Sequence, residues 1–174
     1  NEFLYGEDAR VITQKELEER IALAPDALKK LKNVVMIQCV GSRNGDRPYC
    51  SRICCAGAIK NALKLKALVP DLNIYILYRD IRTYGLKEDY YEKAREEGVL
   101  FIRYEPESAP RLETEGDGLG VAVYEPILRD DLLIRTDLLI LSPGIVPSYE
   151  NESLSKMLKV PLNEDGFFLE AHMK

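Results

Sequence analysis

The sequence predicts an α/β protein with a Rossmann-like parallel sheet, flanking helices and an inserted antiparallel β-meander. Between residues 33 and 104, apolar runs typical of buried strands alternate with helical patterns, in the order strand, helix, strand, helix, strand. Between residues 110 and 136 the pattern changes to alternating apolar and polar residues, which is typical of antiparallel strands. The 174 residues are enough to bury one sizeable core without disulfide bonds.

The chain begins with a predicted lead-in segment, residues 1–32, that contains one short helix. Thr13 and Glu16 have the spacing of a capping box, in which each residue satisfies a backbone N–H of the other. A helix is therefore expected from Gln14 to Ala22, ending before Pro25.

A strand, a long loop and a helix follow. The run VVMIQ predicts a strand over residues 33–38 that is buried on both faces. A loop is expected over residues 39–49. Ser51 is expected to cap a helix whose apolar positions recur every three or four residues and which ends before Pro70.

The rest of the sheet follows the same logic. Strands are expected over residues 73–78 and 99–104, joined by a helix over 87–97, so that the strands run parallel. The turn signals GDG and RDD divide the meander. A last buried strand, 137–141, leads into the tripeptide SPG, which ends at Gly144. Residues 33–144 are therefore predicted to form one dinucleotide-binding-like domain.

The turn after the first strand of such a domain is where a ligand binds. A nucleotide site needs the spacing G-x-G-x-x-G, which lets the backbone approach a pyrophosphate. Here the loop is several residues longer and has only Gly41 and Gly45, at the wrong spacing. The sequence therefore predicts that this turn does not hold a dinucleotide.

Four cysteines, all that the chain has, stand in this region instead: Cys39, Cys50, Cys54 and Cys55. Four thiolates suit either an iron–sulfur cluster or a structural zinc ion. The chain lacks paired C-x2-C knuckles, and adjacent Cys54 and Cys55 suit neighbouring irons better than one tetrahedral ion, so the spacing favours a cluster. A thiol redox pair and simple packing of Cys55 remain open. A bridge between Cys50 and Cys54, one helical turn apart, would be strained.

Several stretches resemble the A subunit of CoB–CoM heterodisulfide reductase and related iron–sulfur flavoproteins of anaerobes. The resemblance covers nearly the whole chain, and its cysteine motif is specific. The matching stretches are VVMIQCVGSR (Val34–Arg43), YCSRICC (Tyr49–Cys55), DIRTYG (Asp80–Gly85) and LKVPLNEDGFFLEAH (Leu158–His172).

This resemblance implies a fragment of a thioredoxin-reductase-like core, with an NADPH-domain-like fold. It implies that Cys39, Cys50, Cys54 and Cys55 bind an irregularly ligated [4Fe-4S] cluster, which air-exposed protein can lose. It also implies FAD in the parent protein only, and electron exchange with other subunits, ferredoxin or hydrogenase-type partners. We expect this piece of an oxidoreductase to relay electrons without supplying an acid, a base or a nucleophile.

Three other residues are candidates for the site. Gly144 in SPG resembles the stretch with which this class of flavoprotein returns toward its FAD domain, so it is expected near flavin, and residues 145–174 are expected to be the return segment. Arg43 and Arg52 are candidates for tuning the cluster, since each adds positive charge near the thiolates.

Composition narrows the function classes. No apolar run is long enough to span a membrane, and the absence of an export signal predicts a cytoplasmic protein with reduced thiols. From Gln38 to Lys66 there are six basic residues and one acid, but the chain carries a net charge of −5, which disfavours nucleic-acid binding. The alternatives to electron relay are a nicotinamide-dependent reductase domain and a zinc-stapled structural module.

Overall fold

The computed structural model describes residues 2–170. The chain divides into two compact units. The larger unit comprises the residues up to Val40 together with Arg52–Pro143, and the smaller unit comprises Gly41–Ser51 together with the residues from Gly144 onward. The last two residues of the predicted Leu158–His172 motif lie outside the described residues.

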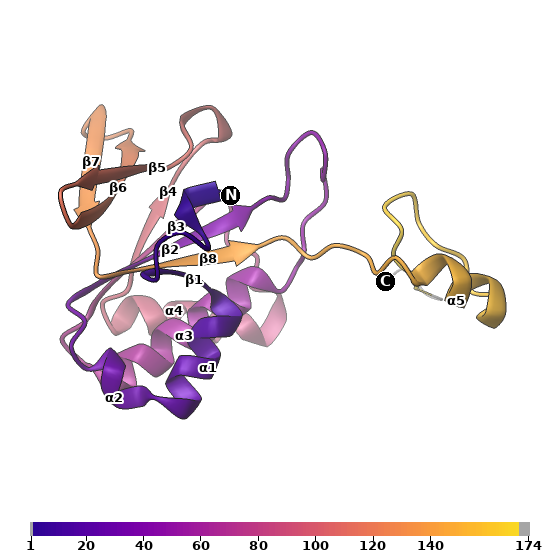
Figure 1. Cartoon of the computed structure of the whole chain (residues 1–174), viewed down its shortest axis with the longest axis horizontal. Helices are drawn as coiled ribbons and strands as arrows, with labels where there is room; N and C mark the ends of the chain where they lie inside the picture. The colour runs from indigo at the N-terminus through magenta and orange to yellow at the C-terminus, as the bar shows by residue number, and fades with distance from the viewer. Residues whose placement is uncertain (1, 171–174) are drawn as a thin grey trace. The chain divides into compact units, whose positions relative to one another are not determined.

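The larger unit is built on a five-stranded parallel sheet with the order β1-β8-β2-β3-β4 (Figure 1). Its strands are β1 (Val11–Thr13), β8 (Leu138–Pro143), β2 (Asn33–Val40), β3 (Asn73–Tyr78) and β4 (Leu100–Arg103). The central strands are apolar on both faces, because both faces are covered.

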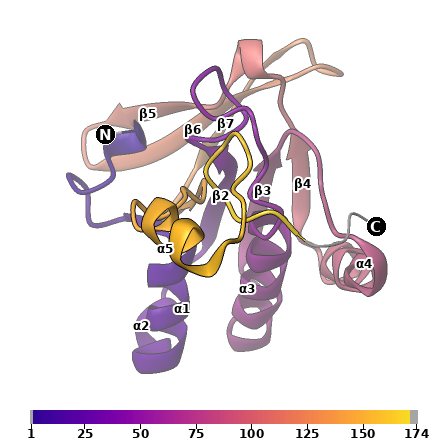
Figure 2. The same ribbon diagram turned by 90° about the vertical axis from the view of Figure 1, so that its right-hand side faces the viewer.

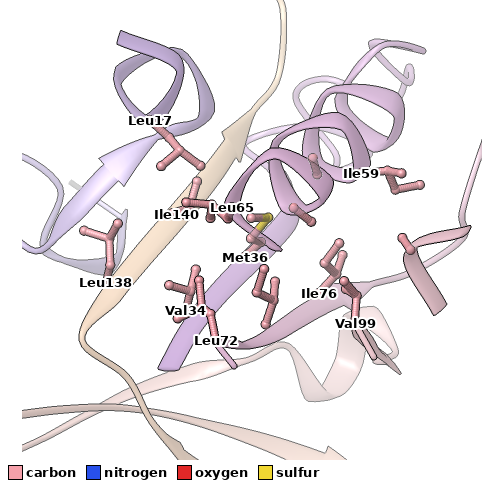
Figure 3. Packing of buried hydrophobic residues seen from close by; sticks show 14 of the residues in the cluster. Leu17, Val34, Met36, Ile59, Leu65, Leu72, Ile76, Val99, Leu138 and Ile140 are labelled. Atoms are coloured by element: carbon pink, nitrogen blue, oxygen red, sulfur yellow. The ribbon is translucent and has the colours of Figure 1, made fainter. Parts of the chain in front are cut away.

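Helices cover one face of this sheet, and α1, α3 and α4 lie side by side on it (Figure 2). The helices are α1 (Gln14–Leu23), α2 (Pro25–Leu28), α3 (Cys54–Leu68) and α4 (Glu88–Glu96). Their apolar sides pack against Val34 and Met36 of β2 and Ile140 of β8, as Figure 3 shows for part of the cluster. The period of apolar residues in α3 positions this helix directly over β2.

A three-stranded antiparallel sheet covers the opposite face. Its strands are β5 (Arg111–Glu115), β6 (Gly118–Glu125) and β7 (Asp130–Arg135). Val121 and Val123 of β6 pack with Val35 and Ile37 of β2, so alternate residues of β2 serve two separate cores.

The order in which the chain adds strands to the parallel sheet reverses between β2 and β8. From β2 the chain proceeds outward through α3 to β3 and through α4 to β4, whereas β8 and β1 lie on the other side of β2. In open parallel sheets, ligands bind beyond the carboxyl ends of the strands at such a reversal. Any site of this kind in the larger unit therefore lies at the ends of β2 and β8.

The smaller unit contains one helix, α5 (Asn151–Leu158), in the described residues. The side-chain amide of Asn151 donates to the carbonyl of Gly166 at 2.9 Å. Leu162 and Phe168 form a single antiparallel bridge.

The predicted fold class, the strand over 73–78 and the antiparallel meander are confirmed. The predicted capping box is also present, since Thr13 Oγ1 accepts from the backbone N–H of Glu16 and the Glu16 carboxylate accepts from the N–H of Thr13. The predicted cap of α3 is wrong. The Ser51 hydroxyl accepts a hydrogen bond from the N–H of Ile145 at 2.8 Å, and α3 begins at Cys54.

The lead-in segment contributes β1 to the edge of the parallel sheet, beside β8. The predicted boundaries after residues 32 and 144 remain predictions. No helix among the described residues is long and apolar enough to cross a membrane.

Candidate metal centre

Cys39 lies near the end of β2, where the strand becomes irregular. The pairing register with β8 shifts between Ile37 and Val40, and Cys39 has a φ of 62°. A left-handed conformation is unfavourable for a residue with a Cβ, and such bulges re-aim side chains near functional sites. The end of β2 therefore turns its thiol out of the regular strand pattern.

Cys54 and Cys55 are the first two residues of α3. The Cys54 thiol donates to the carbonyl oxygen of Pro143 at 3.8 Å, and the Cys55 thiol donates to the carbonyl oxygen of Asp80 at 3.6 Å. Pro143 ends β8 and Asp80 follows β3, and β2 is the strand between these two. The two thiols therefore straddle the end of β2, at the same edge of the sheet as Cys39.

The fourth cysteine, Cys50, belongs to the smaller unit. Its neighbour Tyr49 packs edge-on against Phe167, with ring centroids 5.2 Å apart, so this loop is tied to the segment near residue 167. All four cysteines are thiols in the structure. Within residues 2–170, no three side chains of the ligand-forming types are close enough together to hold a metal ion. The four-ligand set thus remains a prediction.

Arg43 and Arg52, the candidate tuning residues, come near the two ends of the loop in the sequence. Both have left-handed backbone conformations, with φ values of 56° and 62°. Together with Cys39 they place three strained positions within fourteen residues of chain. Strain of this kind concentrates at functional sites, because the surrounding structure must compensate for it.

Gln38 is a buried polar residue that reasoning from the sequence missed. It is 1% exposed, and neither its side-chain nitrogen nor its side-chain oxygen has a hydrogen-bond partner within the described part of the chain. Strand alternation assigns it to the helix-facing side of β2, with Met36. The available signal was a polar residue that closes the apolar run VVMI, directly before a cysteine.

Other polar side chains on the helix-covered face of the sheet form a hydrogen-bonded set around Gln14. Gln14 donates to Ser142 Oγ at 3.3 Å and to the Met36 sulfur at 3.5 Å, and it accepts from Asn61 at 2.8 Å. This group satisfies Gln14 but leaves Gln38 without a partner. An orphaned buried amide is costly, so the side chain of Gln38 would gain from a further binding partner. The side-chain oxygen of Asn61 also has no hydrogen-bond partner within the described part of the chain.

Gly144 occupies a tight position in the smaller unit. A Cβ at this position would lie 2.7 Å from the Cβ of Ser42 and 3.2 Å from the carbonyl oxygen of Gly41. Only glycine allows this approach without a shift of the backbone. Gly144 therefore has a packing role, and its predicted proximity to flavin remains a proposal.

Comparison with known proteins identifies the relatives of this chain. No family model matches it. It is 41% identical, over 99% of its length, to the iron–sulfur A subunit of CoB–CoM heterodisulfide reductase of Methanocaldococcus jannaschii. It is 38% identical, again over 99% of its length, to the A subunit of the H2/formate:CoB–CoM heterodisulfide, ferredoxin reductase of Methanococcus maripaludis.

The chain is homologous to a segment of the heterodisulfide reductase A subunit. It spans 28% of the length of these two relatives. A third relative, the A subunit of the ferredoxin:CoB–CoM heterodisulfide reductase of Methanosarcina acetivorans, is 38% identical over 82% of the chain.

Solved structures of other proteins show the fold class to which this chain belongs. The chain is similar to T. acidophilum thioredoxin reductase, with a TM-score of 0.55 and 15% identity over 93% of the chain and 44% of that protein. It is similar to the ornithine hydroxylase of Pseudomonas aeruginosa, with a TM-score of 0.55 and 12% identity over 93% of the chain and 46% of that protein. The predicted thioredoxin-reductase-like fold is therefore confirmed.

Replacing Gly144 with alanine should destabilise the chain. The added methyl group meets Ser42 and the Gly41 carbonyl, and overpacking of this kind costs about 1–3 kcal/mol of unfolding free energy. Gly57→Ala is the matched control, because nothing lies within 4 Å of a Cβ there and alanine favours the interior of α3. Urea denaturation followed by circular dichroism should show a loss for the first variant and no loss for the second. Equal stability of Gly144→Ala and the unsubstituted chain would contradict the close approach.

Proposed function

We propose that this chain is an electron-transfer domain that holds a [4Fe-4S] cluster through Cys39, Cys50, Cys54 and Cys55. The observation that carries the proposal is the concentration of every cysteine at the reversal point of the sheet and in its loop, in a homologue of a subunit named as iron–sulfur. Four thiolates are the usual donor set for such a cluster.

The residues present suit this group. Three of the thiols belong to one edge of the sheet in the larger unit, and Cys50 lies in the loop that follows β2. Among the described residues, no side chain caps the N-terminus of α3, so the positive end of the helix dipole is available to the negatively charged cluster. Arg43 and Arg52 would add to this positive field.

When bound, the cluster accepts and donates single electrons. The chain's own residues would hold it and set the surrounding charge, and none is assigned as an acid, a base or a nucleophile. FAD would be bound elsewhere in the parent polypeptide, with residues 145–174 returning the chain toward it and Gly144 near the flavin. The other subunits of a heterodisulfide-reductase-like complex, ferredoxin or a hydrogenase-type protein would exchange the electrons, in the cytoplasm.

A nicotinamide-dependent reductase domain is the second candidate, because the fold is that of thioredoxin reductases. The glycine turn that would hold the pyrophosphate is replaced by the longer loop that follows Cys39. We therefore expect no calorimetric binding of NADPH or NADH to the anaerobic protein. Dissociation constants of about 10 μM or tighter would favour the reductase instead.

The ligand assignment predicts the effect of removing each thiol. After anaerobic reconstitution with iron and sulfide, the reduced protein should give the paramagnetic resonance signal of a [4Fe-4S]⁺ cluster. Cys39→Ala, Cys50→Ala, Cys54→Ala and Cys55→Ala should each weaken or convert this signal, because each removes one ligand.

Ser51→Ala is the matched control. It lies in the same loop and removes a hydroxyl that bonds the Ile145 N–H, but it removes no thiol, so the signal should persist. Arg52→Ala should also keep the signal but lower the midpoint potential, because it removes positive charge. An unchanged signal in the Cys39→Ala protein would rule out the four-ligand model.

Gln38 should raise the potential of the same centre. An N–H donated to a cluster sulfur stabilises the reduced form, which carries the greater negative charge. Gln38→Met should therefore lower the midpoint potential in a redox titration while leaving the signal intact. In the cluster-free protein the same change should raise the unfolding free energy, by about 1 kcal/mol, because it removes an orphaned buried amide.

Gln14→Met makes the same substitution in an amide that is already hydrogen-bonded. It should leave the potential unchanged and lower the stability of the cluster-free protein. If both variants behave alike in both measurements, Gln38 has no special relation to the cluster.

A further inference from the structure

A groove of about 520 Å³ lies in the larger unit between α3 on one side and α4 with the segment before it on the other. Its floor is apolar and comes from one side of α3, with Ala56, Ile59 and Leu63 at helical spacing. Tyr90 of α4 lines the facing wall and is 59% exposed. The groove begins one residue after Cys55, so it runs away from the candidate metal centre along α3.

The groove is rimmed with positive charge. Four of its ten lining residues are lysines, Lys60, Lys64, Lys87 and Lys93, and among the described residues none of the lining side chains is acidic. Lys87, directly before α4, and Tyr90 and Lys93 within it recur every three residues, so one stripe of this segment lines the groove. This concentration is unusual for a chain with a net charge of −5.

Two of these four lysines form ion pairs with carboxylates, and the other two supply most of the positive charge at the rim of the groove. Lys60 donates to Glu18 at 2.6 Å, and this hydrogen bond lowers the pKa of the Glu18 carboxyl. Lys93 lies 3.7 Å from Glu97. Lys64 comes from α3 and Lys87 directly precedes α4, and Lys64 also helps to lower the pKa of the Glu18 carboxyl. These two lysines are the charges that a ligand in the groove would meet.

The apolar surface extends beyond the groove. Tyr84 is 63% exposed and Leu86 is 85% exposed, and both lie in the segment that leads into Lys87. Exposed apolar side chains that adjoin a rim of like charges are typical of protein interfaces, in which an apolar centre supplies affinity and charges set orientation.

We propose that this groove docks an acidic protein surface that carries apolar side chains, on a partner that exchanges electrons with the domain. The proposal rests on the proposed function for the nature of the partner, and on charge complementarity for the place of docking. A protein fits better than a nucleic acid, because the floor is apolar and the rest of the chain is acidic. The groove starts at Ala56, next to Cys55, so a partner that fills this end would lie near the edge of the sheet where the thiols are.

The test uses the full-length polypeptide, purified without oxygen, and a two-cluster ferredoxin as the acidic probe. Binding is measured by biolayer interferometry at low and high ionic strength. Lys64→Glu combined with Lys87→Glu should weaken binding by about tenfold or more at low salt, because it reverses the two rim charges. Tyr90→Ala should weaken binding at both salt concentrations, because it removes apolar contact area.

Lys15→Glu combined with Lys30→Glu is the matched control. It makes the same change in net charge at two lysines that do not line the groove, and it should alter binding by less than about twofold. Iron and acid-labile sulfide are counted in every preparation. If the protein still lacks a cluster after anaerobic reconstitution with iron and sulfide but binds through Lys64 and Lys87, the proposed function is refuted and the docking site stands.

Three outcomes would overturn the docking proposal. They are the absence of ferredoxin binding by the unsubstituted protein, equal weakening by the groove pair and the control pair, and unchanged binding after reversal of Lys64 and Lys87. The variants are also tested with anionic phosphatidylglycerol vesicles. Selective loss of vesicle binding, with ferredoxin binding retained, would identify a membrane surface as the occupant and reject the protein partner.

Discussion

The parallel pairing of β2 with β8 is the interaction on which the rest of the larger unit depends. The two strands run in register from Val34, opposite Leu138, to Ile37, opposite Leu141. Both strands are buried on both faces, so their backbone groups must pair with neighbouring strands. The pairing also places the reversal of strand order between them, and in an open sheet this is where a ligand finds room.

The candidate metal centre lies where the regular pairing of β2 with β8 ends. Beyond Ile37 the register shifts, and the strained backbone at Cys39 leaves the regular pattern. The first turn of α3 then lies over the end of β2, with one thiol directed to the Pro143 carbonyl and the next to the Asp80 carbonyl. Where a nucleotide-binding domain has a short glycine turn for a pyrophosphate, this chain has a longer loop and a helix terminus that carry thiols.

Much of the fold could be predicted from the sequence because its signals are local. The apolar run NIYILY fixes a buried strand, and the alternation around Val121 and Val123 fixes an antiparallel one. The pairing of β1 with β8 could not be foreseen, since a three-residue strand has little pattern and its partner lies more than 120 residues away. The prediction that Ser51 caps α3 was wrong for a similar reason, because the Ser51 hydroxyl accepts a hydrogen bond from the N–H of Ile145, which is distant in the sequence.

Some features of the candidate site could likewise be predicted from the sequence, and others could not. Four clustered cysteines are visible in the sequence, and the homology to the heterodisulfide reductase A subunit follows from their surroundings. The orphaned amide of Gln38 and the lysine rim over α3 and α4 are properties of packing, which bring together residues that have no recognisable spacing. Lys64 and Lys87, for example, belong to segments that are separated by a strand.

The central claim is that the thiols at the end of β2 and in its loop hold an iron–sulfur cluster. Metal and sulfide analysis of the 174-residue chain, purified without oxygen, tests this most directly. The account predicts about four irons and about four acid-labile sulfides per chain, with little zinc. About one zinc per chain and no labile sulfide would contradict it, and would make the cysteines a structural zinc site.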